Sequence, residues 1–339
     1  MYPRGVKMNM KKIVVAGGGV LGSQIALQSA FCGFDVTIWL RSEGSIERAE
    51  PKLLRLKEIY LNTLEAMKTN PAAYCRGFSC ESELSADKIN ELKQKVEDAY
   101  DGITLTTSYE EAGNDADLII EAIAEDPKQK IAFYQELAKH IPEKTIIATN
   151  SSTMLPSAFA QYTGRPEKYL ALHFANEIWR NNTAEIMGHP DTGQEYYDAV
   201  CEFAENINMI PLKLKKEQPG YILNSMLVPF LSAAEALYAD GVADFETIDK
   251  TWMLATGAPL GPFRILDVVG LTTAYNIGMM NPKASDPDTI EGKVAAMLKE
   301  KIDAGKTGIN SGEGFYKYSK SLLSTLTQYY YRRLYTNLL

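Results

Sequence analysis

The chain of 339 residues contains few cysteines and few histidines. Its four cysteines form no Cys-x-x-Cys pair and no grouping with histidine, so we expect no metal site. Cys75 and Cys80 are close enough in sequence for a disulfide, but in a chain of this length we expect reduced thiols and a cytoplasmic protein. Three histidines leave few candidates for proton transfer near neutral pH.

Positive charge and long apolar runs are also scarce. Lys and Arg number 35 against 43 Asp and Glu, a formal net charge of −8, and we therefore expect no nucleic-acid partner. The longest apolar run, residues 221–239, is interrupted by Asn224, Pro229 and Glu235, whereas a membrane span needs about 20 almost uninterrupted apolar residues. Residues 1–12 lack the apolar core of a signal peptide. We expect a soluble protein without a membrane partner.

What the chain does contain is typical of a globular protein with two domains. Hydrophobic residues make up 45% and charged residues 23%. Apolar runs alternate with helical patterns in the first part, which predicts a doubly wound, mostly parallel α/β sheet. Beyond it the pattern is helical, so we place an α/β domain at 1–212 and an all-α domain at 213–339. The predicted strands are 13–16, 36–40, 103–106, 117–124, 144–149 and 169–174.

A glycine motif follows the first predicted strand. Gly17, Gly19 and Gly22 form G-x-G-x-x-G between that strand and a helical pattern, and a second strand follows. The first glycine allows a tight turn, the second lets a pyrophosphate approach the backbone, and the third lets the helix pack closely. The N–H groups at the helix start, at Val20 and Leu21, can hold the anion. The motif in this setting predicts a Rossmann-type domain that binds a dinucleotide.

The end of the second predicted strand bears on the type of dinucleotide. NAD sites usually place Asp or Glu there to bond the ribose 2′-hydroxyl, but this chain has Leu40, followed by Arg41 and Ser42. Leucine cannot bond a diol, whereas Arg41 and Ser42 could hold a 2′-phosphate through charge-assisted hydrogen bonds. We therefore favour NADP(H) over NAD(H). Glu43 keeps NAD(H) open because its carboxylate could reach the ribose, and Arg41 could be only a solvated loop residue.

Polar side chains mark the ends of two further strands. Asn150 and Ser152 follow one predicted strand, and His173 lies near the end of the next. Ligands of a doubly wound sheet bind beyond the carboxyl ends of its strands, so these residues are candidates for the site. His173 is the best acid–base candidate, with a satisfied core histidine as the alternative. We expect His140 at a helix end and His189 in a solvated turn.

The order of these motifs resembles that of the 3-hydroxyacyl-CoA dehydrogenase family over residues 10–318. The resemblance implies hydride transfer between a nicotinamide cofactor and a 3-hydroxyacyl-CoA, with short substrates such as 3-hydroxybutyryl-CoA and acetoacetyl-CoA. It also implies a homodimer formed through the helical domain. The matching elements are the glycine motif, 122–125 with Lys130, 148–152, 172–174, Glu185, 219–224, 259–263 with Asp267 and Gly270, and 308–316.

The resemblance also implies roles for individual residues. His173 matches the catalytic base and Glu185 its carboxylate partner, and Ser152 and Asn224 match polar residues beside the reacting oxygen. Each has a simpler alternative: Glu185 as an exposed carboxylate on an edge strand, and Ser152 and Asn224 as capping residues.

On the cofactor side, Glu125 and Lys130 match residues of the family's site. We place Ala124 and Asn150 on the cofactor side as well, because Ala124 ends one predicted strand and Asn150 follows another. Glu125 could instead be a helix-start charge, and Lys130 a solvated helix residue.

The segment after His173 departs from the family. Glu177 replaces the usual proline after His173, and residues 179–182 add bulk near the expected acyl pocket, so chain length and the need for CoA stay open. A hydroxy acid or sugar acid dehydrogenase of the same family is the first alternative, and a non-catalytic dinucleotide-binding protein is the second. Residues 319–339 lie beyond the resemblance, and their apolar spacing suggests an amphipathic helix, with a solvated tail as the equal alternative.

Overall fold

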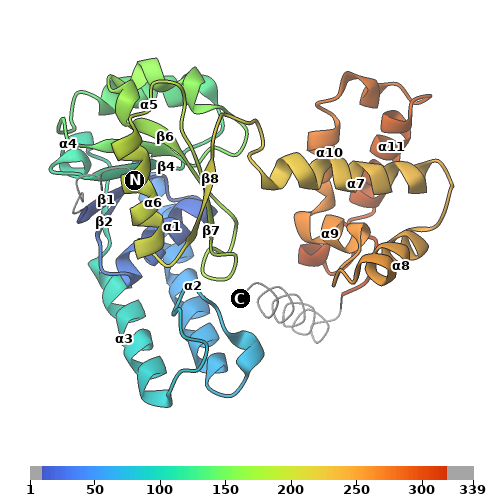
Figure 1. Cartoon of the computed structure of the whole chain (residues 1–339), viewed down its shortest axis with the longest axis horizontal. Coiled ribbons are helices and arrows are strands. Elements are labelled where there is room, and N and C mark those ends of the chain that lie inside the picture. Colours follow the sequence, from blue (N-terminus) through green and yellow to red (C-terminus); the bar gives the residue numbers. More distant parts are fainter. Residues whose placement is uncertain (1–9, 319–339) are drawn as a thin grey trace, which may run out of the picture. The chain divides into compact units, whose positions relative to one another are not determined.

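The structure is a computed structural model that describes residues 10–318 (Figure 1). The chain divides into two compact units between Ile222 and Leu223. The sequence-based boundary, between 212 and 213, falls inside the last strand of the first unit. The helix suggested for 319–339 lies outside the described residues.

The first unit is built on one eight-stranded sheet with the order β3-β2-β1-β4-β5-β6-β7-β8. All neighbours pair in parallel except β6 and β7, which are antiparallel. The expected mostly parallel α/β domain followed by a helical domain is thereby confirmed. The strands are β1 Lys12–Ala16, β2 Asp35–Trp39, β3 Thr104–Thr106, β4 Leu118–Glu121, β5 Ile146–Thr149, β6 Tyr169–Phe174, β7 Thr183–Met187 and β8 Ile210–Leu214.

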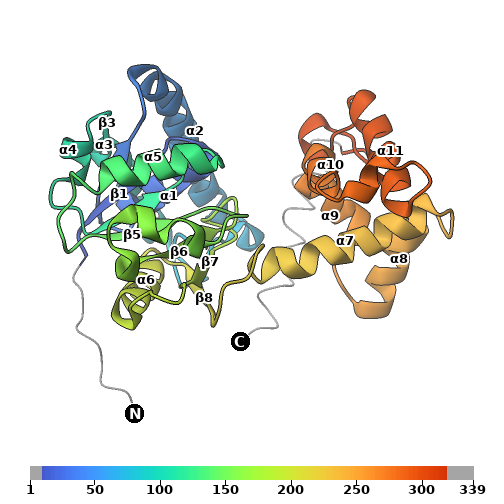
Figure 2. The same cartoon turned by 90° about the horizontal axis from the view of Figure 1, so that it is seen from above.

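Helices cover both faces of this sheet, which is why its central strands are apolar throughout. In β1, Ile13 and Val15 face α1, α2 and α6, whereas Val14 and Ala16 face α4 and α5. Figure 1 shows α5 on one side of the sheet and α1 and α6 on the other, and Figure 2 looks onto the α5 side. The helices are α1 Val20–Phe31, α2 Glu43–Met67, α3 Ala86–Gly102, α4 Tyr109–Gly113, α5 Pro127–Leu137 and α6 Gln194–Asn206.

A second apolar core lies between α1, α2 and α3. Trp179 is buried in it and packs against Tyr60, with ring centroids 5.1 Å apart. The backbone of Gly77 approaches so closely that a Cβ there would lie 2.5 Å from Cα of Trp179. Trp179 was expected to add bulk near the acyl pocket, but its indole lies in this core instead.

The second unit is helical and encloses its own core, which includes Leu231, Phe263 and Leu298. Asp244 caps α8 by accepting a hydrogen bond from the backbone N–H of Thr247. Near the end of the described chain, Glu313 forms isolated bridges with Gly308 and Lys317. The helices are α7 Leu223–Ala239, α8 Phe245–Thr256, α9 Pro262–Val269, α10 Leu271–Gly278 and α11 Ile290–Asp303.

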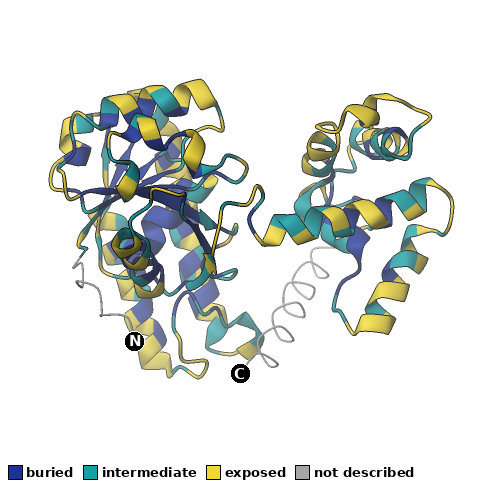
Figure 3. Cartoon of the chain, turned by 45° about the horizontal axis from the view of Figure 1, so that its top comes forward, coloured by how far each residue is buried: buried dark blue, intermediate teal, exposed yellow. Residues whose placement is uncertain are grey.

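Short 3₁₀ turns complete the described chain, at Pro71–Ala73, Pro156–Ala158, Ala160–Thr163, Pro166–Lys168, Pro282–Ser285 and Ile309–Ser311. Figure 3 shows the buried strands of the sheet in dark blue and the exposed outer sides of the helices in yellow. Between residues 10 and 318, every helix is too short or too polar to cross a membrane.

Candidate active site

The strand order places the candidate site at one point of the sheet. The connections turn to opposite sides between the neighbouring strands β1 and β4, and ligands of such sheets bind beyond the carboxyl ends at that point. Three loops leave the sheet there or next to it: 17–19 after β1, 122–126 after β4 and 150–155 after β5. The sequence-predicted site residues of the first unit lie in these loops or beside them.

The glycine loop is closed on one side and open on the other. A Cβ on Gly17, whose φ is +121°, would lie 2.5 Å from the carbonyl oxygen of Ala122. A Cβ on Gly22 would lie 2.1 Å from the carbonyl oxygen of Gly17, so the loop and α1 need both glycines for their close approach. Above Gly19, the residue before Val20 at the start of α1, a Cβ would meet no atom within 4 Å. A helix start with free space in front of it suits the pyrophosphate of a dinucleotide.

A cavity of about 460 Å³ lies beside this loop. Leu40 and Arg41 line it, and Leu40 is buried against the glycine loop, where an NAD site would usually have a carboxylate. Glu43, which kept NAD(H) open, is not among the lining residues, and its Oε1 accepts a hydrogen bond from Thr107. Ser42 is the residue before α2, and its Oγ lies 3.0 Å from Oγ of Ser45. The lining residues are 17–19, 39–41, Ser45, Arg48, Lys52, Tyr109, 122–124, Gln129, Ala132 and Phe133.

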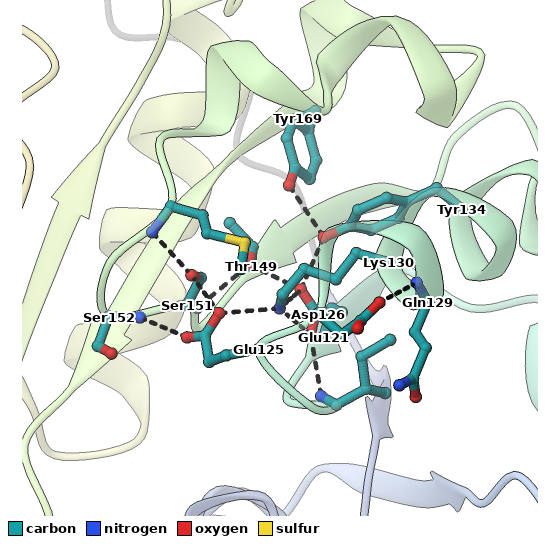
Figure 4. A network of polar contacts seen from close by, with 12 residues as sticks. Glu121, Glu125, Asp126, Gln129, Lys130, Tyr134, Thr149, Ser151, Ser152 and Tyr169 are labelled. Atoms are coloured by element: carbon teal, nitrogen blue, oxygen red, sulfur yellow. Dashed lines mark hydrogen bonds and ion pairs between the residues drawn. The ribbon is translucent and has the colours of Figure 1, made fainter. Parts of the chain in front are cut away.

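Lys130 is buried, with 1% of its side chain exposed. Its Nζ lies 2.7 and 2.8 Å from the two carboxylate oxygens of Glu121 and 3.7 Å from Oε2 of Glu125 (Figure 4). The alternative of a solvated lysine is therefore wrong. Lys130 therefore forms ion pairs with Glu121 and Glu125, and its predicted contact with the cofactor stays a prediction.

Glu125 connects the loops that follow β4 and β5. Its carboxylate accepts hydrogen bonds from Oγ of Ser151, at 2.8 Å, and from the backbone N–H of Ser152, at 2.9 Å. Ala124, beside it, belongs to the wall of the cavity. Glu125 thus fixes the backbone that carries Ser152, and Figure 4 shows Glu125 between Lys130 and the two serines.

Glu121 is a residue of this region that the sequence analysis missed. It is fully buried at the end of β4 and, besides Lys130, accepts hydrogen bonds from the hydroxyls of Tyr134 and Thr149, both at 2.7 Å. Burial raises the pKa of Tyr134 well above its usual value, so this phenol stays a hydrogen-bond donor. The sequence signal that could have identified Glu121 is a carboxylate at the end of an otherwise apolar strand.

The antiparallel pairing of β6 with β7 sets His173 directly opposite Glu185. Nδ1 of His173 lies 3.1 Å from Oε2 of Glu185, and 11% and 5% of these two side chains are exposed. The second oxygen of Glu185 accepts a hydrogen bond from the backbone N–H of Ile222 at 2.8 Å. Because β8 pairs with β7 on its other side, Glu185 is not on an edge strand, and the alternative of an exposed carboxylate is wrong.

Tyr221 is a second residue that sequence reasoning did not find. Its ring stacks on the imidazole of His173, with centroids 4.4 Å apart and planes 17° from parallel. Its hydroxyl donates to the carbonyl oxygen of Ser151 at 2.7 Å, and its φ of +56° is unusual for a residue with a side chain. Tyr221 therefore links the histidine to the loop that carries Ser152.

The structure also places two further predicted site residues, Asn150 and Asn224. Asn150 accepts a hydrogen bond from the backbone N–H of Phe174 at 3.1 Å, so it joins the ends of β5 and β6, and its contact with the cofactor stays a prediction. Asn224 lies in the first turn of α7 in the second unit, and its contact with the reacting oxygen likewise stays a prediction.

The contacts of the other two histidines and the state of the cysteines are structural. His140 follows α5, and its Nε2 lies 3.1 Å from Glu136. His189 was expected to be solvated, but it is buried and its Nε2 lies 2.9 Å from the carbonyl oxygen of Pro166. All four cysteines are free thiols, so Cys75 and Cys80 form no disulfide. No group of His, Cys, Asp and Glu suited to a metal ion occurs in the part of the chain that the structure describes.

Fold and site together define a dinucleotide-dependent oxidoreductase, and comparison with known proteins gives the family. The chain matches the family model of the 3-hydroxyacyl-CoA dehydrogenase NAD binding domain over residues 12–218, and that of the C-terminal domain over 220–318. It is 30% identical to 3-hydroxybutyryl-CoA dehydrogenase from Clostridioides difficile, over 91% of this chain and 100% of that protein. The chain belongs to the 3-hydroxyacyl-CoA dehydrogenase family.

Further relatives agree with this assignment. The chain is 30% identical to the mitochondrial hydroxyacyl-coenzyme A dehydrogenase of Homo sapiens, over 92% of each chain. Among solved structures, a diketoreductase described as acting on dicarbonyl compounds is 45% identical, with a TM-score of 0.79 over 92% of this chain and 100% of that one. FadB2 of M. tuberculosis is 26% identical, with a TM-score of 0.73 over 91% and 99%.

Proposed function

We propose that the protein interconverts a short-chain 3-hydroxyacyl-CoA, such as 3-hydroxybutyryl-CoA, and the corresponding 3-oxoacyl-CoA by hydride transfer with NADP(H). The observation that carries this proposal is the contact between His173 on β6 and Glu185 on β7, in the same sheet as β1, after which the glycine loop follows. With Nδ1 engaged by the carboxylate, Nε2 of His173 is the ring nitrogen left to exchange a proton with the substrate.

The side chains around His173 suit proton transfer. The bound nicotinamide supplies or accepts the hydride. In oxidation, Nε2 of His173 removes the hydroxyl proton, and in reduction the imidazolium returns a proton to the carbonyl oxygen. Glu185 fixes the tautomer by accepting a hydrogen bond from Nδ1–H and stabilises the imidazolium. The stacked ring of Tyr221 holds the imidazole plane.

We assign Ser152 and Asn224 to hydrogen bonds with the reacting oxygen. The support for Ser152 is its backbone, which Glu125 holds in place, and the support for Asn224 is its match to the family motif. Glu125 and Lys130 are proposed on the cofactor side, with Lys130 acting through Glu125 as a positioning residue.

For the cofactor we propose NADP(H) rather than NAD(H). Leu40 supplies no acceptor for a ribose hydroxyl, and Arg41 lines the cavity next to it. We also propose a cytoplasmic homodimer.

The test is the steady-state oxidation of NADPH and of NADH by acetoacetyl-CoA, measured with the wild type and with His173→Gln. We expect turnover with NADPH by the wild type and a loss of at least about 10²-fold in the variant, because general acid–base catalysis contributes about 10²–10⁴-fold. Absence of turnover with either nucleotide would overturn the proposal. Equal activity of the variant would favour a non-catalytic dinucleotide-binding protein and point to a contaminating enzyme.

A second candidate substrate is a CoA-free 3-oxo or 3-hydroxy compound. The diketoreductase at 45% identity favours it, as does the departure from the family at Glu177. The same assay with ethyl acetoacetate and free acetoacetate in place of acetoacetyl-CoA distinguishes the two. A higher kcat/KM for a CoA-free compound would select this candidate, and a free acid preferred over the ester would select a hydroxy acid dehydrogenase.

A further inference from the structure

We propose that Arg41, Arg48 and Lys52 form a binding subsite for the 2′-phosphate of NADP(H), with α2 supplying two of the three cations. The inference rests on the proposed function only in taking the ligand of the cavity to be a dinucleotide. It adds a specific set of residues that decide between the phosphorylated and the unphosphorylated cofactor. From the sequence, Arg41 and Ser42 are the candidates for this role, whereas the contribution of α2 emerges only from the fold.

The first observation is that α2 packs directly on the glycine loop. A Cβ on Gly18 would lie 2.7 Å from Cβ of Ala49 and 2.8 Å from Cδ2 of Leu40, so only glycine allows this approach. Ala49 is fully buried, and its neighbours on the helix surface, Arg48 and Lys52, lie one turn apart at the border of this contact. Both consequently line the cavity beside the loop.

The second observation is how the three cations are held. Arg48 donates from Nη2 to Oγ of Ser45 at 2.9 Å, back toward the start of α2. Lys52 donates to the carbonyl oxygen of Gly18 at 3.4 Å, and Arg41 donates to Oε1 of Gln129 at 3.2 Å. Each of these partners is neutral, so the hydrogen bonds position the three cations and leave their positive charges uncompensated.

The third observation is the absence of countercharge. Among the described residues, none of the three cations takes part in an ion pair with a carboxylate, and no Asp or Glu lines the cavity. By comparison, Lys88, Lys144 and Lys293 each have a carboxylate oxygen within 3.2 Å of Nζ. The start of α2, a helix that runs from Glu43 to Met67, adds the positive end of its dipole.

Together these features favour a compact ligand group with two negative charges. A phosphomonoester has this charge and accepts several charge-assisted hydrogen bonds, for which Arg is well suited. The location supports the 2′ position of the ribose, because Leu40 and Arg41 stand where NAD-specific sites place the carboxylate that bonds the 2′-hydroxyl. The main competing role for Arg48 and Lys52 is a contact with the pyrophosphate, which NAD(H) and NADP(H) share.

A pair of ligands separates these two roles. Adenosine 2′,5′-bisphosphate and 5′-AMP differ only in the 2′-phosphate, and calorimetry measures their Kd values on the full chain without any substrate. We expect the wild type to bind the bisphosphate at least about tenfold more tightly, because one charge-assisted bond is worth about a tenfold change. The substitutions Arg48→Gln and Lys52→Gln should each raise the Kd of the bisphosphate by about tenfold and change the Kd of 5′-AMP by less than about twofold.

The matched control is Arg55→Gln, which removes the same charge from an exposed position of α2 that does not line the cavity. It should leave the ratio of the two Kd values unchanged. An equal loss of affinity for both ligands in Arg48→Gln and Lys52→Gln would overturn the proposal in favour of a shared phosphate contact. An unchanged ratio in both variants, or a wild type that does not distinguish the ligands, would also overturn it. Because no substrate is present, failure of the acetoacetyl-CoA assay leaves this result unaffected.

Discussion

Glu185 is the clearest case in which one carboxylate has two tasks. It faces Nδ1 of His173 with one oxygen and the backbone N–H of Ile222 with the other, in a position almost closed to water. Substitution by glutamine keeps the size and one acceptor but removes the charge that stabilises the imidazolium. We expect Glu185→Gln to lower kcat by about 10³–10⁴-fold, as for other carboxylate–histidine pairs, with a small effect on KM.

This prediction is checked by the pH dependence of kcat together with thermal unfolding of the variant. Glu205→Gln, which changes an exposed carboxylate near the end of α6, is the matched control and should retain wild-type kcat. A Glu185→Gln variant that folds and keeps full kcat over the pH range would contradict the role of the pair.

The buried ion pair of Glu121 and Lys130 gives a second prediction at the scale of residues. Lys130→Met leaves the fully buried carboxylate of Glu121 without its cation, and loss of one partner of such a pair costs about 3–5 kcal/mol. The double variant Glu121→Gln with Lys130→Met should recover part of that loss, because no charge is then buried. Urea unfolding measures both free energies, and equal destabilisation of the single and double variants would show that the ion pair itself is unimportant.

At the scale of secondary structure, helix α7 contains a carboxylate that favours its protonated form. Glu235 is 6% exposed, its Oε1 has no hydrogen-bond partner among the described residues, and burial raises its pKa to about 7. Between the ordinary pKa of glutamate and about 7, the folded state keeps a proton that the unfolded state has released. The free energy of unfolding should therefore fall as pH rises through this interval, by up to about 3 kcal/mol.

Glu235→Gln should remove this dependence and stabilise the protein at pH 8. Urea unfolding at pH 5, 6, 7 and 8 tests the expectation, with Glu246→Gln, on the exposed side of α8, as the control. If wild type and Glu235→Gln lose stability in parallel between pH 5 and pH 8, another group is responsible.

Sequence patterns predicted the central strands well because those strands are apolar on both faces. The predicted strand 169–174 coincides with β6, whereas β8 was missed because Ile210–Leu214 contains Pro211 and Lys213 and lies at the edge of the sheet. The pairing of His173 with Glu185 followed from the family resemblance. The contacts of Tyr221 and Glu121 were not predictable, because they join segments far apart in the sequence and leave no periodic pattern.

At the scale of the whole molecule, the proposed homodimer is open to direct measurement. The family resemblance implies a contact through the helical domain, but Leu231 and Ala234 of α7 are buried in the second unit's own core. The large apolar side chains that α7 leaves exposed are Leu223, Met226 and Leu237. We expect Met226→Lys to raise the dimer dissociation constant by at least about tenfold, because a charge replaces apolar area at the contact.

Sedimentation equilibrium over nanomolar to micromolar concentrations measures this change. Met280→Lys, which alters another exposed methionine of the second unit outside α7, is the control. A wild type with the mass of a single chain at every concentration would rule out the dimer, and an unchanged constant in Met226→Lys would place the contact elsewhere.

The position of Tyr221 and Ile222 has a consequence for protein engineering. Both residues lie beyond residue 218, where the match to the NAD binding domain ends, yet they contact His173 and Glu185 through a ring stack and a backbone hydrogen bond. A chimera that joins this nucleotide-binding half to the helical half of a relative must therefore place the crossover after residue 222. A crossover at 219 would replace Tyr221 and Ile222 with the relative's residues next to His173 and Glu185, although it lies at the border between the two family models.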